Sequence, residues 1–318
     1  MSAPARILVI KLGALGDVAQ AFAAFAAIRA HHGGSHIVLL TTPAFAGVLG
    51  ASPWFDEVWS EARAPIWRVG AWLALRHRIR SAGFARVYDL QTSARSDRIF
   101  RMLGPGPRPE WVGRVAGASH RHADPRRDHM HTQDRLAGQL AVAGVRVTDG
   151  PDLSWMHADI SRFRLPAPVA LLVPGASPHR PEKRWPVAHF AALAMRLAAG
   201  GIGSAVLGAG TDAALAATIR AAAPDAIDLC GHTRLDDLVP LGRACMVAIG
   251  NDTGPMHWLA AAGAPVLTLF SSASDPDLCA PRGRRARILR RADLSELGVD
   301  DVADAAFGIA DPGARPAS

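Results

Sequence analysis

The stretch Asn251-Asp252-Thr253-Gly254-Pro255-Met256-His257 organises the second half of the chain, because a strand-like segment precedes it and a helix-like segment follows it. Residues 246–249 form an apolar run typical of a buried strand, and residues 258–263 are helix formers that end in a glycine. A second apolar run, 266–270, comes next. We therefore predict a strand-to-helix turn inside a βαβ unit.

This turn has the composition of an anion-binding site. Asp252 or Thr253 can cap the helix, Pro255 suits its first turn, and Gly254 lets a ligand approach the backbone closely. The exposed N–H groups and the positive end of the helix dipole would then bind a phosphate. The alternative is an ordinary capped helix without a ligand.

The composition indicates a globular protein with two domains. The chain of 318 residues is longer than one ordinary core requires, and 49% of its residues are hydrophobic. The net charge of +7 favours anionic partners such as nucleotide phosphates, nucleic acid or an acidic membrane surface. We expect no spanning helix and no signal peptide, because no apolar run has the required length or place. Three widely spaced cysteines indicate reduced thiols and thus a cytoplasmic protein.

The N-terminal half opens like a nucleotide-binding domain but lacks the dinucleotide fingerprint. Strand-like runs at 6–10 and 36–40 flank a loop and a helix. The loop contains Gly13 and Gly16 but not G-x-G-x-x-G, and the second strand ends without an acidic residue. No P-loop motif occurs in the chain, so P-loop chemistry is excluded.

Asp17 immediately precedes the helix that we predict from Val18 onward. As a helix N-cap this aspartate would be purely structural. As a carboxylate at the carboxyl edge of a parallel sheet, it would lie where such folds bind ligands, and it could act as a general base toward an acceptor hydroxyl. The residues leave both roles open, and the two are compatible.

Two further segments of this half are candidates for substrate contact. After a strand at 87–90, Gln91, Arg95 and Arg98 suit a polyhydroxylated or phosphorylated acceptor, although a capped helix start would have the same composition. The segment 104–132 is rich in Gly, Pro, Arg and His, but its spacing matches no zinc pattern. We predict no metal site there, and a mobile basic loop that reaches the substrate.

Residues 66–87 mix tryptophan with arginine. This mixture suits a surface that lies on an anionic bilayer. The alternative is an amphipathic helix that packs on the sheet and exposes a basic face to solvent.

A Pro-Ala-Pro sequence at 166–168 marks a domain boundary, and a second series of strands and helices begins after it. The first of these strands leads into a loop, 174–186, that presents Ser177, Lys183 and Arg184. A hydroxyl and a lysine after a strand suit a diphosphate, whereas a solvated linker is the alternative.

The turn Gly208–Ala213 satisfies G-x-G-x-x-A after a strand, and it supports a rival hypothesis of an NAD(P)-linked oxidoreductase. The acidic residue expected at the end of the following strand is absent, and Asp212 could instead reach a ribose. A second rival, a nucleic-acid binder, is suggested by the net charge. Tyr88 is the only tyrosine and the tryptophans are scattered along the chain, so we expect no nucleic-acid partner.

Taken together, four pieces of the sequence resemble glycosyltransferase family 9, the ADP-heptose:lipopolysaccharide heptosyltransferases. The likeness extends from about residue 6 to about residue 300. The four pieces are Lys11 with Gly16-Asp17, Asp89-Leu90-Gln91 with Arg95, Lys183-Arg184-Trp185-Pro186, and the turn at 251–257 with a later Asp-Pro.

The resemblance implies an α/β protein of GT-B architecture, in which two Rossmann-like domains with parallel sheets face a central cleft. Residues 1–165 would form the acceptor-binding domain and residues 166–318 the nucleotide-sugar-binding domain. The last helix or the tail could return to the N-terminal domain.

The resemblance also implies roles for individual residues. Asp17 would be the catalytic base, and Lys183 would steady the leaving diphosphate. Asp252 would face the sugar hydroxyls, while the backbone at Thr253 and Gly254 would contact phosphate. Asp212 would hold the ribose, and Thr233 and Leu235 would lie where the adenine edge is recognised. The remaining donor-binding candidates are Gly16, Ser177, Arg184, Pro255 and His257.

The predicted activity is an inverting, metal-independent transfer of a sugar, heptose by the resemblance, from an ADP-sugar to the lipopolysaccharide core or a related lipid-linked glycan. A different nucleotide-sugar donor stays open as an alternative. No cofactor is expected. A lipid-linked acceptor would place the protein in the cytoplasm, in peripheral contact with the inner leaflet of the inner membrane.

Overall fold

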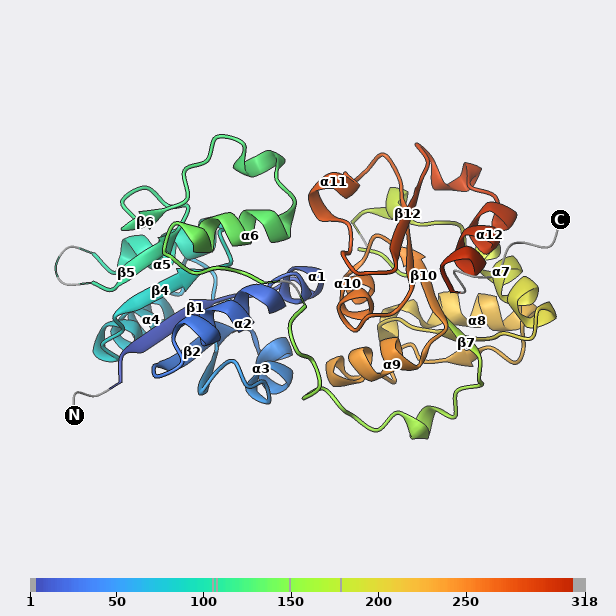
Figure 1. Ribbon diagram of the computed structural model, residues 1–318, viewed down its shortest axis with the longest axis horizontal. Helices are drawn as coiled ribbons and strands as arrows, with labels where there is room; N and C mark the ends of the chain where they lie inside the picture. The colour runs from blue at the N-terminus through green and yellow to red at the C-terminus, as the bar shows by residue number, and fades with distance from the viewer. Residues whose placement is uncertain (1–3, 105, 107, 149, 178, 311–318) are drawn as a thin grey trace. The chain divides into compact units, whose positions relative to one another are not determined.

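The computed structural model describes residues 4–104, 106, 108–148, 150–177 and 179–310. Its contacts divide the chain into two compact units, Met1–Trp155 and Met156–Ser318. Each unit contains its own six-stranded parallel sheet (Figure 1). The predicted pair of Rossmann-like α/β domains is therefore confirmed. The boundary falls before the Pro-Ala-Pro sequence at 166–168, because residues 156–165 make their contacts within the second unit.

The first sheet has the strand order β3-β2-β1-β4-β5-β6. Its central strand, β1, pairs with two neighbours, so that Leu8 lies opposite both Val38 and Val87. These positions are fully buried, as the continuous apolar runs predicted. The strands are β1 (Arg6–Ile10), β2 (His36–Thr41), β3 (Glu57–Ser60), β4 (Arg86–Asp89), β5 (Glu110–Gly113) and β6 (His120–Arg121).

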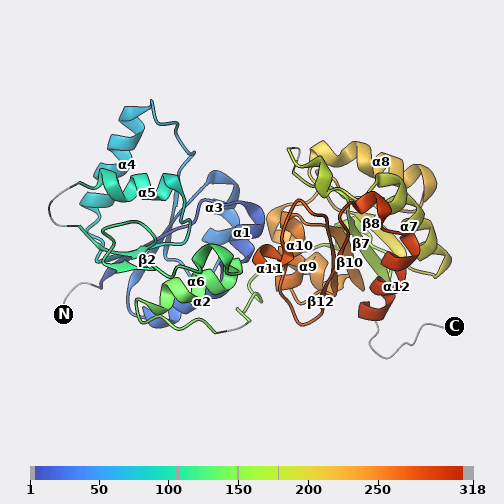
Figure 2. The ribbon, with the colours of Figure 1, turned by 90° about the horizontal axis from the view of Figure 1, so that it is seen from above.

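Helices cover both faces of this sheet: α4 and α5 lie on one face, and α2 and α6 on the other (Figure 2). A core under the first pair includes Ile79, Phe100 and Trp111. The helix expected from Val18 is interrupted by one turn at residues 20–21, whose backbone angles remain right-handed helical. The helices are α1 (Leu15–Ala19), α2 (Phe22–His31), α3 (Pro43–Gly50), α4 (Val69–Ser81), α5 (Ala94–Met102), the 3-10 segment η1 (Arg127–His129) and α6 (Thr132–Ala141).

The second sheet has the strand order β12-β11-β10-β7-β8-β9. Here β7 and β10 are neighbours, and Leu171 lies opposite Ala248. The turn at 251–257 joins β10 to a helix and then to β11, so the predicted βαβ unit is confirmed. The strands are β7 (Val169–Val173), β8 (Gly203–Val206), β9 (Ile227–Asp228), β10 (Val247–Asn251), β11 (Val266–Phe270) and β12 (Ala286–Arg290).

The helices of the second unit pack on this sheet in the same way. The α-helices are α7 (Val187–Ala199), α8 (Ala213–Ala222), α9 (Leu238–Ala244), α10 (Gly254–Ala261), α11 (Pro276–Cys279) and α12 (Val299–Ala310). The 3-10 segments are η2 (Ser161–Phe163), η3 (Pro181–Lys183), η4 (Gly210–Asp212), η5 (Leu235–Asp237) and η6 (Leu294–Glu296).

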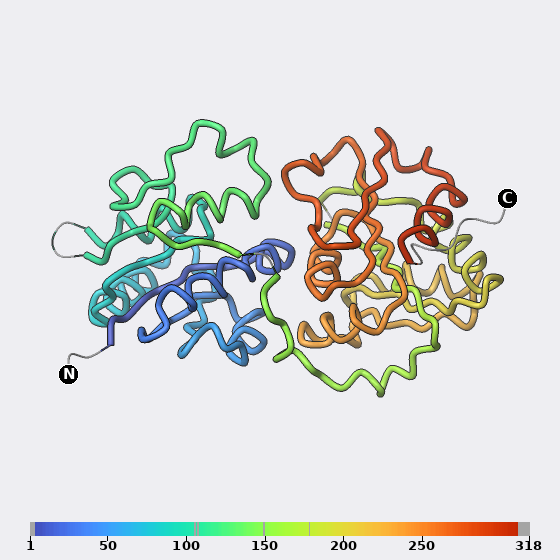
Figure 3. The backbone as a smooth tube through the Cα atoms, viewed as in Figure 1, coloured from blue at the N-terminus to red at the C-terminus, as the bar shows by residue number. Residues whose placement is uncertain are grey.

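The last helix, α12, packs against α7, β10 and β11 of its own unit (Figure 3). Its apolar face, with Val302, Ala306 and Ile309, is part of the core of that unit. The expectation that the last helix or the tail could return to the N-terminal domain stays a prediction, although this face of α12 is buried in the core of its own unit. The tail, residues 311–318, lies outside the described residues.

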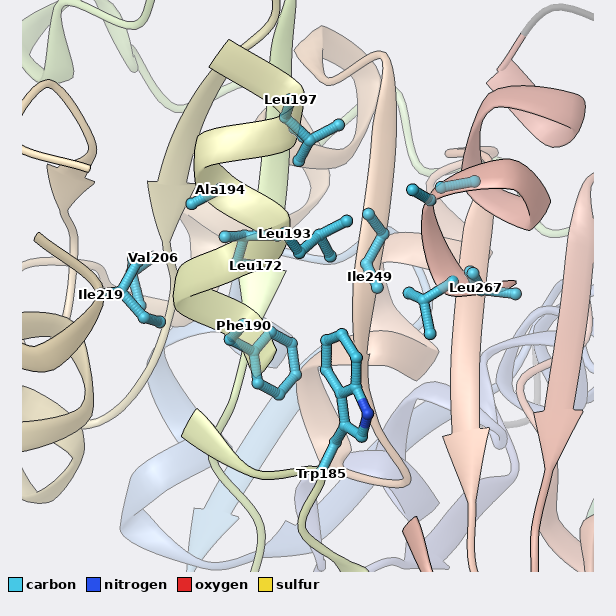
Figure 4. Close-up of a cluster of buried hydrophobic side chains, with 14 of the residues drawn as sticks. Leu172, Trp185, Phe190, Leu193, Ala194, Leu197, Val206, Ile219, Ile249 and Leu267 are labelled. Atoms are coloured by element: carbon cyan, nitrogen blue, oxygen red, sulfur yellow. The ribbon is translucent and has the colours of Figure 1, made fainter. Parts of the chain in front are cut away.

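The core of the second unit is continuous from the sheet to the loop that precedes α7. Trp185 is fully buried and packs against Phe190, with ring centroids 4.8 Å apart. Figure 4 shows both rings beside Ile249 and Leu267 of the sheet. Burial of such large side chains anchors the C-terminal end of the 174–186 loop.

In both sheets the strand order reverses beside the first strand of the unit, between β1 and β4 and between β7 and β10. Open parallel sheets bind ligands outside the carboxyl ends of the strands at such a reversal. The two places to look for chemistry are therefore the segments that follow β1 and β4 in the first unit, and those that follow β7 and β10 in the second.

Candidate active site

The segments after β7 and β10 are held together by a buried asparagine. Asn251 is inaccessible to solvent; its Oδ1 accepts the N–H of Trp185 at 2.9 Å, and its Nδ2 donates to the carbonyl of Pro174 at 2.7 Å. The Trp185 indole donates to the carbonyl of Leu297 at 2.9 Å. Both ends of the 174–186 loop are thus fixed to the sheet edge. This role of Asn251 was not apparent from the sequence, because its partners Trp185 and Pro174 lie in a distant segment.

Lys183 and Asp252 meet at this edge. The lysine Nζ lies 2.6 Å from the aspartate Oδ2, and the two side chains are only 18% and 7% exposed. Lys183 lies in the segment that follows β7, and Asp252 lies in the segment that follows the neighbouring strand β10, as predicted from the sequence. An ammonium group is therefore held in a sheltered position directly beside the N-terminus of α10.

The N-terminus of α10 differs from the predicted cap. Thr253 occupies the N-cap position with an extended backbone, but its side chain makes no capping hydrogen bond, and the Asp252 carboxylate is engaged with Lys183. Pro255 lies in the first turn, as predicted. The helix start is thus not capped by either of the two side chains expected to do so, which leaves its dipole available to an anion.

Asp212 and Ser177 lie at the same sheet edge. Asp212 Oδ2 accepts the N–H of Ala209 at 2.9 Å, and a Cβ added to Gly175 would come within 2.8 Å of that oxygen. The carboxylate therefore touches the start of the 174–186 loop, where Ser177 is exposed. Arg184 donates to the carbonyl of Ala176 at 3.1 Å, so its guanidinium supports the loop.

The remaining donor candidates are less closely placed by described contacts. Thr233 and Leu235 lie between β9 and α9, in a segment held by the buried Asp237, whose Oδ2 accepts the N–H of Arg234 at 2.7 Å and pairs with Arg162 at 2.5 Å. His257 is buried within α10. These positions stay predictions for donor contact.

In the first unit, Asp17 lies in α1, in the segment that follows β1. Its Oδ2 accepts the N–H of Ala14 at 3.1 Å, across the first turn of α1, which contains Gly16. Gly13 has φ +116°, and a Cβ there would lie 2.9 Å from the Phe45 ring. Asp17 is not the N-cap that we expected, because α1 begins at Leu15 and its N-cap is Ala14; Asp17 is the third residue of the helix and accepts the N–H of that N-cap residue. The carboxylate is only partly buried, which is compatible with the second role.

The three acceptor candidates differ in how the fold uses them. Gln91 Oε1 accepts the N–H of Leu12 at 2.7 Å and so links the segments after β1 and β4. Arg95 binds Glu61 through two contacts of 2.8 and 2.9 Å, and its guanidinium lies 4.7 Å from the Trp72 ring centroid. Arg98 is exposed on α5. Arg95 thus anchors the segment before α4, a structural task that the sequence did not reveal.

Asp89 and Lys11 are a buried polar pair at the ends of β4 and β1. Asp89 is fully buried and accepts the N–H groups of Gln91 and Thr92, while Lys11 donates to the carbonyl of Leu90 at 3.2 Å. Burial raises the pKa of Asp89 to about 6 and lowers the pKa of Lys11. The sequence indicated this buried pair only through its position, since Lys11 and Asp89 are charged residues at the ends of apolar strands.

Replacing Asp89 by asparagine should raise stability at alkaline pH. Because the folded-state pKa of about 6 exceeds the ordinary value of 3.8, the folded protein binds more protons between these values and loses stability as pH rises through 6. The loss amounts to about 3 kcal/mol, and Asp89→Asn removes it while keeping an oxygen for the two N–H groups. The lost attraction to Lys11 reduces the gain. Thermal unfolding of both proteins should give curves that diverge from pH 4 to pH 8, and a variant less stable than the parent at pH 8 would contradict this.

The described residues form neither a metal-binding cluster nor a membrane-spanning helix. Among them, no group of three or more His, Cys, Asp or Glu side chains is arranged to hold a metal ion. None of the helices in the described part of the chain is both long and apolar enough to cross a bilayer.

A family model and known relatives match this chain. The model described as glycosyltransferase family 9 (heptosyltransferase) matches residues 72–299, which is more than half of the chain and does not include Asp17. Lipooligosaccharide heptosyltransferase 2 of Haemophilus influenzae is 34% identical over 128 residues, covering 39% of this chain and 36% of that protein. Lipopolysaccharide heptosyltransferase 2 of Salmonella typhimurium is 32% identical over 166 residues, covering 51% of this chain and 47% of that protein. Each match thus spans less than half the relative's length.

A solved structure agrees with the fold over almost the whole chain. The ADP-heptose lipopolysaccharide heptosyltransferase II of Escherichia coli superposes with a TM-score of 0.79 at 22% identity, covering 96% of this chain and 98% of that one. At this identity the agreement shows a shared fold, which is the GT-B type that the sequence predicted.

Proposed function

Because the chain belongs to glycosyltransferase family 9, we propose that it transfers a sugar, heptose in the first instance, from an ADP-sugar to the lipopolysaccharide core or a related lipid-linked glycan. The family assignment rests on the match over residues 72–299. The observation that carries the proposal is the Lys183–Asp252 pair beside the start of α10, at the reversal between β7 and β10. A sheltered ammonium beside a helix N-terminus is suited to a nucleoside diphosphate.

In this proposal the second unit binds the donor. Lys183 and the N–H groups of α10 at Thr253 and Gly254 stabilise the diphosphate as it leaves, and Asp252 holds both Lys183 and the sugar hydroxyls. Asp212 binds the ribose. Charge on the leaving group is neutralised by these protein groups, so the reaction needs no metal ion. The other donor contacts that we retain as proposals are Gly16, Ser177, Arg184, Thr233, Leu235, Pro255 and His257.

The first unit supplies the base and binds the acceptor. Asp17 removes the proton from the acceptor hydroxyl as that oxygen attacks the anomeric carbon from the face opposite the diphosphate, so the configuration inverts. One oxygen of its carboxylate accepts the N–H of Ala14, which fixes the orientation of the group. Gln91, Arg95 and Arg98 follow β4 at the same edge, where they contribute to acceptor binding directly or by shaping the loop.

The function is tested by transfer from ADP-heptose to truncated core lipopolysaccharide, with the product mass and anomeric configuration measured. We expect one heptose to be added with inversion, and the rate to be unchanged when EDTA is present. UDP-sugars offered in parallel test the alternative donor. Failure with every nucleotide-sugar and stabilisation by NAD would overturn the proposal.

The oxidoreductase alternative finds less support. A dinucleotide fingerprint acts after the strand at the reversal of the sheet, which here is β7. The turn Gly208–Ala213 follows β8, one strand away, and a Cβ on Gly208 would lie 2.9 Å from the Cβ of Asp212. Contact with Asp212 therefore explains why residue 208 is a glycine, and no bound pyrophosphate is needed to explain it.

We also propose peripheral contact with an anionic membrane from the cytoplasmic side, through the start of α4. Ile66, Trp67, Val69 and Leu73 are all exposed, Trp67 by 78%. The opposite face of α4 is buried through Leu75 and Ile79. The segment therefore packs as an amphipathic helix and also exposes apolar side chains, so each of the two alternatives describes one of its faces. Exposed arginines accompany the apolar side chains, a combination that favours an anionic bilayer over another protein. We call Ile66, Trp67, Val69 and Leu73 the apolar patch.

Removal of the apolar patch should weaken vesicle binding without affecting chemistry. In Trp67→Ser/Leu73→Ser, burial of two large side chains in lipid is lost, and we expect binding to phosphatidylglycerol-containing vesicles to fall by about tenfold or more. Co-sedimentation measures the effect, and transfer to a short water-soluble acceptor should be unchanged. Met195→Ser on α7 is the matched control, because Met195 is also an exposed apolar side chain. Equal binding by all three proteins would refute the assignment.

A further inference from the structure

Three arginines gather in the first unit, away from the residues given roles above. Arg114 follows β5, Arg127 begins η1, and Arg135 lies on α6. We call these residues the arginine cluster. Arg127 is the most unusual of them, because an arginine side chain is rarely buried without a partner, and this residue is only 8% exposed.

The arginine cluster contains several buried donors without acceptors. Among the described residues, Nε and Nη2 of Arg127, Nε of Arg114 and Nε of Arg135 have no hydrogen-bond partner. The nearest carboxylate to Arg127 is that of Asp128, 3.6 Å from Nη1, on a side chain that points to solvent. Buried polar groups are nearly always paired, so two unpaired donors on one buried guanidinium, Nε and Nη2 of Arg127, indicate a site for an acceptor molecule.

The positive charges are close enough to repel one another. Burial, followed by the charges of Arg135 and Arg114, lowers the pKa of Arg127. Arg135 also helps to lower the pKa of Lys11 and of His122. A cluster of like charges is unfavourable without an anion, which again points to a ligand.

The carboxylates near the arginine cluster compensate it only in part. Asp97 is engaged with Arg114 Nη2 at 2.9 Å, and the buried Asp89 opposes the lowering of the Arg127 pKa although its Oδ2 makes no hydrogen bond. Asp124 accepts the N–H of Arg126 at 2.8 Å. None of these acids satisfies Nε and Nη2 of Arg127, which are the two parallel donors of its guanidinium fork.

We propose that the arginine cluster binds a phosphate monoester, with Arg127 as the bidentate ligand and Arg135 and Arg114 as flanking cations. A fork of two N–H groups matches two oxygens of the anion, and further donors from separate elements suit a third oxygen, which a carboxylate does not have. Lys11 is within the electrostatic influence of both Asp17 and Arg135. Resting on the proposed function, the inference is that the phosphate belongs to the acceptor and helps to place its hydroxyl at Asp17.

The site is tested first without any reaction, by titrating the whole protein with inorganic phosphate at constant ionic strength in a calorimeter. We expect Arg127→Gln and Arg135→Gln each to weaken phosphate binding by about tenfold or more, since each removes a charged hydrogen-bonding partner. Arg101→Gln is the matched control for loss of one positive charge, because Arg101 is an exposed arginine of α5 to which no role is assigned. Because phosphate can also bind near Lys183, the titrations are repeated in Lys183→Met, which should retain the arginine-dependent binding.

Kinetics then identify the source of the phosphate. Arg127→Lys, which keeps the charge but not the fork, should raise KM for a phosphorylated acceptor and leave KM unchanged for the same acceptor after phosphatase treatment. Equal effects on both acceptors, with phosphate binding still dependent on Arg127, would assign the site to free phosphate. Phosphate binding that depends on Lys183 and not on Arg127 would overturn the proposal, as would equal affinity for acetate. A loss of transfer with intact phosphate binding would count against the proposed function alone.

Discussion

Asp17→Asn should reduce the rate of sugar transfer by about 10²- to 10⁴-fold, which is the usual contribution of a general base. Asparagine has nearly the shape of aspartate and keeps an oxygen for the N–H of Ala14, to which Asp17 Oδ2 now binds at 3.1 Å. The substitution therefore removes the charge and the basicity and leaves the loop closed. Steady-state transfer from ADP-heptose measures the loss, and calorimetry should show unchanged affinity for ADP, because the Asp17 side chain has no proposed contact with the donor.

The capping role of Asp17 makes the opposite prediction. If the carboxylate only closes the loop, Asp17→Asn should keep almost full turnover, because asparagine is as good a cap as aspartate. Asp293→Asn is the control, since Asp293 also accepts a backbone N–H, that of Ser295 at 2.8 Å, at a helix start with no proposed chemistry. Turnover of Asp17→Asn within a few-fold of the parent would leave the reaction without a base and would require another proton acceptor.

The order of strands and helices was predictable because buried parallel strands are continuous apolar runs. Arg6–Ile10 and Val266–Phe270 were both identified in this way, and both are strands buried on two faces. The two-residue strand β6 carries no such pattern, since two residues define no period. The strand β9 was expected, but it ends at Asp228, so the expectation that no acidic residue stands at its end was wrong. The place of α12 was also not predictable, because an apolar helical face does not say which core it joins.

The site was predictable as far as the sheet edge determines it. Lys183 and Asp252 are 69 residues apart, but both follow strands of one parallel sheet, so their approach could be expected. Partners that depend on long-range packing could not be. The sequence places Arg95 after a strand, where it suits a ligand, yet nothing local indicates that Glu61 occupies its guanidinium. The burial of Arg127 is a similar case, because its surroundings come from three separate elements.

Lys183→Met is expected to have the other large effect, through the leaving group. The ammonium lies beside the N-terminus of α10, and loss of one such electrostatic contact typically lowers kcat by about 10²- to 10³-fold. Methionine keeps the length of the aliphatic side chain, so the loss is one of charge. Arg180→Met is the matched control in the same loop, because the Arg180 side chain is 53% exposed and its guanidinium donates to the carbonyl of Ala273. The Arg180→Met variant should retain the kcat of the parent protein and its affinity for ADP.

A purely structural role for Lys183 has to be separated from this, because removing the lysine leaves Asp252, with its side chain 7% exposed, as an unpaired carboxylate. Asp252→Asn in the Lys183→Met background relieves that charge and should restore thermal stability. Because Asp252 is also proposed to hold the sugar hydroxyls, the rate of the double variant is compared with that of Asp252→Asn alone. If Lys183 acts only by holding Asp252, these two variants should turn over equally fast. If the ammonium stabilises the leaving diphosphate, as we propose, the double variant should regain its melting temperature but stay slower than Asp252→Asn, because no cation then faces the departing oxygen.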